Sequence, residues 1–146
     1  QTLTIASRGR WYSRPAGQPG AAWQIVAATP ADVRVTPDEE YRFSIHTGAS
    51  EEIVNAIGAL AGLAGLVYLN LSYCAGVTDA GLAQLRAFPG LRQLYLRGCE
   101  SLTDAGLRHL RGLAGLQALE LADCPQLSDA AVAALQSALP GCKIVR

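Results

Sequence analysis

The sequence predicts an α/β fold built from repeated strand–helix units. Three observations predict it: a segment of 25 residues that recurs through the second half of the chain, apolar residues in steps of two at the start of each copy, and apolar residues in steps of three later in each copy. Steps of two are typical of a strand with one buried face, and steps of three to four are typical of a helix. The length of 146 residues suits one domain with a single core.

The first part of each repeat is a predicted strand. It occurs as LVYLNLSYC at 66–74, as LRQLYLRGC at 91–99 and as LQALELADC at 116–124. In the first copy Leu69 and Leu71 alternate with polar or aromatic residues, so we expect the leucines to face the core and the residues between them to face solvent.

The second part of each repeat is a predicted short helix. Leu82, Leu85 and Phe88 are three residues apart and form one helical face. Before each helix stands a hydroxyl residue that suits the N-cap, followed by an aspartate whose charge opposes the helix dipole; the pairs are Thr78–Asp79, Thr103–Asp104 and Ser128–Asp129. Glycine suits the exit from the first two helices, at Gly90 and Gly115.

The combined pattern, L-x-x-L-x-L-x-x-C-x-x-L, resembles the leucine-rich repeat. Its cysteine resembles that of the cysteine-containing subclass, found in the substrate receptors of F-box-type ubiquitin ligases and in bacterial repeat proteins. The resemblance covers residues 66–146 and implies a right-handed βα superhelix, a curved α/β solenoid of about four repeats. No F-box pattern is present in the sequence, so a ubiquitin-ligase role does not carry over.

A fourth, degenerate copy is predicted upstream. Ile57 precedes Leu82 by 25 residues, which predicts a helix over 51–61, and Phe43 precedes Leu69 by 26, so this copy lacks one residue between strand and helix. The repeats then occupy 41–65, 66–90, 91–115 and 116–141, followed by a terminal strand over 142–146.

Residues 1–40 do not repeat and are predicted to form a β-rich N-terminal cap. Strands are expected over 2–6 and 23–28, with an extended piece over 33–37 and a loop rich in Pro and Gly over 13–21. A repeat stack exposes an apolar end unless another segment covers it, which is the reason to expect a cap. The alternative is that this stretch begins a separate domain.

The cysteines are predicted to be structural. Cys74, Cys99 and Cys124 recur every 25 residues, which stacks them in a ladder, whereas a zinc site needs ligands that converge on one point. The parallel Cβ vectors of such a ladder do not suit disulfides either. We expect four buried, reduced thiols, with Cys142 as the fourth, no metal or other cofactor, and a reducing compartment, the cytoplasm.

Several classes of function are disfavoured. Twelve basic and twelve acidic residues cancel, so the chain has no general attraction to nucleic acid or anionic lipid. No apolar run reaches the ~18–20 residues of a membrane helix, and the first residues do not resemble a signal peptide. The two histidines, His46 and His109, lack the neighbours of a known nucleophilic motif and are expected to be solvated. We therefore predict that the chain is not an enzyme.

The outward side chains of the predicted strands are the candidate binding site. Tyr and Arg are frequent at protein interfaces, and Tyr68 and Tyr95 stand on neighbouring strands of a face that solenoids commonly use for binding. The alternative is that the two tyrosines only stabilise the sheet as a cross-strand pair. The predicted concave-face site comprises Arg42, His46, Tyr68, Asn70, Gln93, Tyr95, Arg97 and Glu120.

The predicted function is recognition of a protein or peptide partner, as the sensor or adaptor part of a larger protein. The sequence contains no Met, even at position 1, so we expect it to be a piece of a longer chain. The alternative function follows from the same observation: a regulatory C-terminal part of an enzyme whose catalytic domain lies in the missing portion. The oligomeric state is left open.

Overall fold

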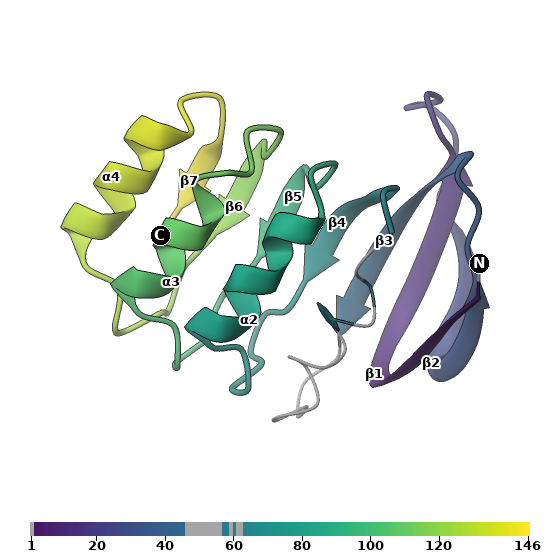
Figure 1. Ribbon diagram of the computed structural model, residues 1–146, viewed down its shortest axis with the longest axis horizontal. Coiled ribbons are helices and arrows are strands. Elements are labelled where there is room, and N and C mark those ends of the chain that lie inside the picture. Colours follow the sequence, from purple (N-terminus) through teal and green to yellow (C-terminus); the bar gives the residue numbers. More distant parts are fainter. Residues whose placement is uncertain (1, 46–56, 59, 61–62) are drawn as a thin grey trace.

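The protein is a mixed α/β structure with its helices on one side of a single sheet (Figure 1). A computed structural model describes residues 2–45, 57–58, 60 and 63–146. Within these residues seven strands form one sheet in the order β2-β1-β3-β4-β5-β6-β7. The predicted site residue His46 lies outside the described residues, and so does most of the predicted helix over 51–61. Both stay predictions.

The 25-residue period sets the register of the sheet from β4 onward. Leu69 is level with Leu94, Leu94 with Leu119, and Leu119 with Ile144, all between parallel strands. The strands are β4 (Leu66–Asn70), β5 (Gln93–Tyr95), β6 (Ala118–Glu120) and β7 (Lys143–Val145). The helices between them are α2 (Asp79–Gln84), continued by the 3-10 turn η1 (Leu85–Ala87), then α3 (Asp104–Leu110) and α4 (Asp129–Ala138).

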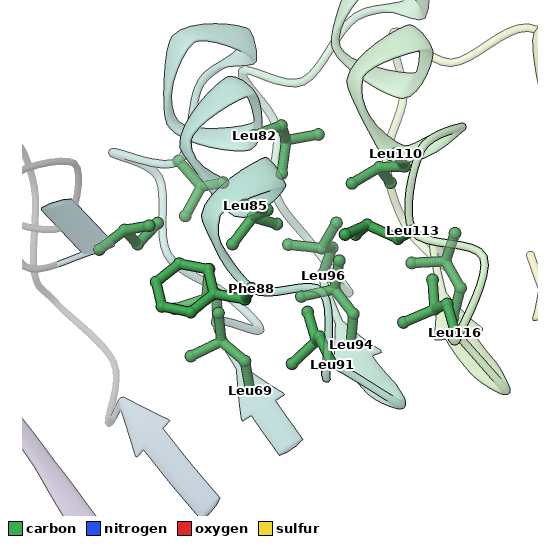
Figure 2. Packing of buried hydrophobic residues seen from close by; sticks show 14 of the residues in the cluster. Leu69, Leu82, Leu85, Phe88, Leu91, Leu94, Leu96, Leu110, Leu113 and Leu116 are labelled. Carbon is green, nitrogen blue, oxygen red and sulfur yellow. The ribbon is translucent and has the colours of Figure 1, made fainter. Parts of the chain in front are cut away.

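The core lies between the sheet and the helices, and its residues are those that the two periodicities predict. Leu69 and Leu71 from the first repeat are fully buried, as are Leu82 and Leu85 from its helical part. Figure 2 shows how the leucines of successive repeats lie one beside another, with Phe88 closing the space between strand and helix. Each repeat therefore buries its apolar residues partly against the next repeat.

The N-terminal forty residues extend this sheet with antiparallel strands. β1 (Thr2–Pro15) pairs antiparallel with both β2 (Gln24–Arg34) and β3 (Glu39–Ile45), and β3 pairs parallel with β4. The prediction of strands here is confirmed, but β1 and β2 run past their predicted ends. The predicted loop over 13–21 is wrong at its start, because residues 13–15 still belong to β1, with Pro15 at the strand end, where proline is tolerated.

Trp11 anchors the N-terminal strands to the repeats. Its side chain is fully buried, stacked on Phe43 with ring centroids 4.5 Å apart and edge-on to Tyr41 at 6.3 Å. Phe43 is level with Leu69 of β4, as the 26-residue offset predicts. Because Trp11 lies outside the repeat, no period marks it as a core residue.

The predicted N-caps are confirmed at two of the three helices. Thr103 Oγ1 accepts from Ala105 N at 3.2 Å, and Ser128 Oγ accepts from Ala131 N at 3.1 Å. The prediction is wrong for Thr78, whose side chain makes no capping hydrogen bond. The same two hydroxyls also donate to an aspartate of the preceding repeat, Thr103 to Asp79 at 2.6 Å and Ser128 to Asp104 at 2.7 Å.

The glycines that follow the helices serve close packing. Neither Gly90 nor Gly115 has a positive φ, so they are not left-handed helix caps. A Cβ at Gly90 would lie 2.8 Å from Ala64 O, and one at Gly115 would lie 3.4 Å from Pro89 O. Successive loops approach backbone to backbone at these positions, which excludes a side chain at Gly90 and leaves little room at Gly115.

Candidate binding face

The strands present two rows of side chains on the sheet face away from the helices, here called the open sheet face. The register places these residues side by side across six strands, so the rows follow from backbone pairing alone. One row contains Tyr12, Arg42, Tyr68, Gln93, Ala118 and Lys143, and the other contains Arg10, Ser44, Asn70, Tyr95, Glu120 and Val145.

Seven of the eight predicted site residues are described, and the structure brings them to this face. Six stand in the two rows, and Arg97 follows the end of β5. Tyr68 and Tyr95 are diagonal neighbours whose ring centroids are 5.2 Å apart with the rings inclined by 38°. Both side chains are half-buried, so each ring keeps part of its surface available to solvent.

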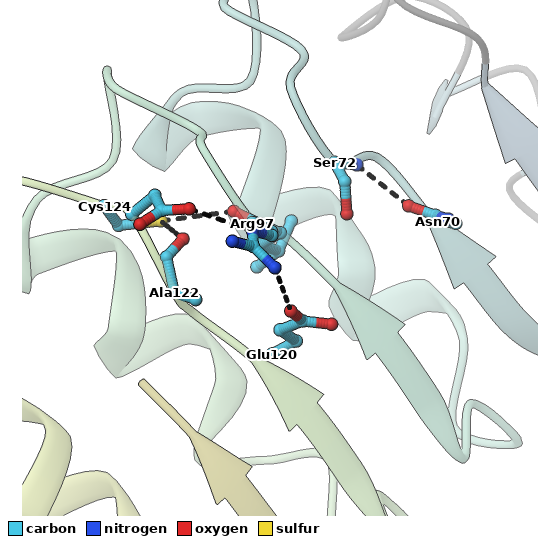
Figure 3. A network of polar contacts seen from close by, with 8 residues as sticks. Asn70, Ser72, Arg97, Glu120, Ala122 and Cys124 are labelled. Carbon is cyan, nitrogen blue, oxygen red and sulfur yellow. Dashed lines mark hydrogen bonds and ion pairs between the residues drawn. The ribbon is translucent and has the colours of Figure 1, made fainter.

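Arg97 is bound to two carboxylates on its own chain (Figure 3). Its Nε donates to Asp123 Oδ2 at 2.9 Å, and its Nη1 lies 3.7 Å from Glu120 Oε1. The hydrogen bond to Asp123 raises the pKa of Arg97, so the guanidinium stays charged. Two carboxylates therefore neutralise Arg97 at this end of the open sheet face.

Asn70 uses its side-chain oxygen within the fold. Its Oδ1 accepts from Ser72 N at 2.9 Å, which fixes the turn that follows β4 (Figure 3). Tyr73, one residue later, has a φ of 60°, an uncommon conformation for an aromatic residue. Asn70 therefore shapes this turn in addition to standing on the predicted site.

Trp23 is a site residue that the repeat pattern could not reveal. It precedes β2 outside the repeats, yet its ring lies against Arg42, with the guanidinium carbon 5.0 Å from the Trp23 ring and 4.1 Å from the Tyr68 ring. These three side chains line two hollows on the open sheet face, of about 310 Å³ and about 340 Å³. The composition of residues 13–23, with Pro, Gly and an aromatic residue, was the only available signal.

Glu40 binds two arginines that line the hollow of about 310 Å³. Its carboxylate is mostly buried and lies 2.7 Å from Arg14 Nη2 and 3.3 Å from Arg92 Nη1. Arg14 also lies over the Trp23 ring at 4.5 Å. Arg14 and Arg92 therefore share one carboxylate, and Arg42 lines the same hollow.

The cysteines are free and buried, as predicted. Cys99 Sγ donates to Leu71 O at 3.3 Å and Cys124 Sγ donates to Leu96 O at 3.1 Å, so each thiol contacts the preceding repeat. Burial raises the pKa of Cys74 to about 11 and that of Cys99 to about 12.

In the described part of the chain, no group of three or more His, Cys, Asp or Glu side chains has the arrangement of a metal site. None of the helices in that part is long and apolar enough to cross a membrane. His109 was expected to be solvated, but it is half-buried, and its Nδ1 is buried without a hydrogen-bond partner.

The comparison with protein families agrees with the pattern read from the sequence. Residues 66–85, which contain β4 and α2, match the family model described as Leucine Rich repeat. The match supports the resemblance to leucine-rich-repeat proteins that the repeated segments indicate. Domains of this kind generally bind other proteins. The cysteine-containing subclass stays a prediction, and no curated protein matches the chain.

Proposed function

We propose that this protein is a non-catalytic recognition module that binds a protein or peptide on the open sheet face. In this proposal residues 41–146 form a curved solenoid of about four repeats, the open sheet face is its concave side, and residues 1–40 cap its N-terminal end. The module acts as the sensor or adaptor part of a larger protein. The reduced cysteines suit a reducing compartment, and we propose the cytoplasm.

The observation that carries the proposal is the aromatic pair Tyr68–Tyr95 beside Arg97. The rings lie 5.2 Å apart on neighbouring strands and keep exposed surface, while Arg97 is exposed next to them. Aromatic and Arg side chains supply a large contact area for little loss of rotamer freedom, which is why they dominate binding hot spots. A sheet that only needed stability would gain the same cross-strand contact from the pair without an adjacent exposed cation.

The test compares binding with folding. Replacing Tyr68, Tyr95 and Arg97 by Ala should weaken capture of a partner from the source cell by at least about thirtyfold, since truncating one true hot spot already costs about 2 kcal/mol. The melting temperature should change little, because exposed strand positions contribute about 0.2–1 kcal/mol each.

The matched control is the double variant Arg108→Ala and Arg111→Ala on the helical side, which should bind as the unaltered protein does. A partner that binds the triple variant equally well, or loses binding to the helical variant, would place the binding site elsewhere. A triple variant that does not fold would instead support the view that the tyrosines serve only the sheet.

A further inference from the structure

The guanidinium of Arg42 lies over two aromatic rings and makes no hydrogen bond or ion pair with another described residue. Tyr68 lies on one side at 4.1 Å and Trp23 at 5.0 Å, both measured from the guanidinium carbon to the ring centroid. The neighbouring Arg14 and Arg92 are both paired with Glu40. Among the described residues Arg42 has neither a carboxylate nor a hydrogen-bond acceptor.

Two amides border the same hollow. Gln93 and Gln117 line it beside Arg42 and Tyr68, and neither side chain hydrogen-bonds to another described residue. A primary amide both donates and accepts, so each is suited to a peptide group of an extended chain. The hollow of about 310 Å³ is large enough to receive a side chain.

Charge is distributed unevenly along the face. Arg14 and Arg92 share the carboxylate of Glu40, with Arg42 lining the same hollow, whereas at the other end Arg97 meets two carboxylates, Glu120 and Asp123. A nucleic-acid strand carries negative charge along its whole length and would be repelled at that second end. A peptide with one acidic position meets the positive end without this penalty.

We propose, resting on the function proposed above, that the hollow between Trp23 and Tyr68 receives an acidic side chain of an extended peptide segment, whose carboxylate pairs with the edge of Arg42. The two rings hold the guanidinium in place, and its parallel N–H groups form the fork that a carboxylate accepts in two hydrogen bonds. Gln93 and Gln117 bind the peptide groups on either side of that residue.

Trp23 provides the readout. The chain has two tryptophans, and Trp11 is fully buried, so a change in fluorescence on binding reports on Trp23. The probe is a short acetylated and amidated peptide in which Glu and Ser alternate, compared with the same peptide carrying Gln in place of Glu. We expect saturable binding that is about tenfold to hundredfold tighter for the Glu peptide, the range typical of a hydrogen bond to a charged group.

The protein variants separate charge from geometry. Arg42→Gln should remove the preference for the Glu peptide, and Arg42→Lys should lose most of it because an ammonium lacks the planar fork. Arg108→Gln on the helical side is the control and should bind as the unaltered protein does. Equal binding of the two peptides, or an unchanged preference in Arg42→Gln, would overturn the inference.

Two further ligands test the identity of the anion. Inorganic phosphate that saturates the Trp23 signal when the Glu peptide does not would assign the hollow to a free anion, and a single-stranded oligonucleotide that binds more tightly than the peptide would assign it to nucleic acid. Either result would overturn the peptide assignment. Neither would affect the test of the general function, since that test varies Tyr68, Tyr95 and Arg97 and reads capture of a protein.

Discussion

The buried thiols show how one residue type serves the stacking of repeats. Leu71 O accepts from Cys74 N at 3.2 Å within its own turn and from Cys99 Sγ at 3.3 Å in the next repeat. Leu96 O accepts in the same way from Cys99 N and Cys124 Sγ. Because a buried carbonyl is costly to leave without donors, a small residue with a weak S–H donor suits this position.

We predict that the thiols react slowly in the native protein. The reactive species is the thiolate, and burial raises the pKa of Cys74 to about 11 and of Cys99 to about 12, so almost none is present near neutral pH. Titration with a thiol reagent should find little reaction under native conditions and four groups in denaturant. Two groups or fewer in non-reducing denaturant would mean that disulfides are present, and rapid native labelling of Cys99 would mean that it is accessible.

At the residue scale the sequence predicts buried positions well and backbone conformation poorly. The period alone identifies the cysteines and the leucines as core residues. It does not identify the left-handed position that follows each strand, because Tyr73, Gly98 and Asp123 occupy it in the three repeats. The Tyr73 ring lies where a Gly98 side chain would be, with Tyr73 Cδ1 2.5 Å from the position of a Cβ. The placement of the Tyr73 ring therefore requires glycine at position 98.

At the scale of elements, the recurring hydroxyl–Asp pair joins one helix to the next. Asp104 Oδ1 accepts from Ser128 N at 2.8 Å and its Oδ2 accepts from Ser128 Oγ at 2.7 Å. Asp79 makes the same pair of bonds to Thr103, and Gly106 leaves the room for it, since a Cβ there would collide with Asp79. The sequence predicted capping within each helix, but pairing between helices needs their relative placement, which a single repeat does not contain.

This pairing predicts a pH dependence. Hydrogen bonds from the backbone N–H and then the hydroxyl of Ser128 lower the pKa of Asp104 below its ordinary value. The stabilisation is therefore complete above the ordinary carboxyl pKa, about 3.9, and is lost as the pH falls through the lowered pKa. Asp104→Asn should unfold at lower denaturant concentration at neutral pH, and the difference from the unaltered protein should shrink as the pH falls.

The measurement is chemical denaturation of both proteins between neutral pH and about pH 2. Glu100→Gln, at an exposed position whose side chain makes no hydrogen bond or ion pair with another described residue, is the control and should follow the unaltered protein at every pH. A difference between Asp104→Asn and the unaltered protein that stays constant with pH would show that the charge of Asp104 plays no part.

At the scale of the whole molecule, the sequence predicted the repeating half of the sheet and most of the open sheet face. The prediction was possible because a fixed period in a parallel sheet determines which residues are level across strands. Trp23 was missed because its position beside Arg42 depends on how the non-repeating strands β1 and β2 pair with the rest of the sheet. The availability of Arg42 was missed for a related reason: Arg14, which pairs with Glu40 in its place, comes from β1, one of those strands.

The joining of β1 to the repeats should be essential to stability. Trp11 is fully buried between the N-terminal strands and the first repeat, stacked on Phe43. Trp11→Ala should lower the free energy of unfolding by about 3–5 kcal/mol, the range for truncating a buried large aromatic residue, and should expose the first rung of the core to a hydrophobic dye. Ile25→Ala on β2 is the control, because that side chain is 67% exposed, and its effect should stay within about 0.5 kcal/mol. If chemical denaturation shows similar small losses for both variants, residues 1–40 are an appendage, and the repeats fold without them.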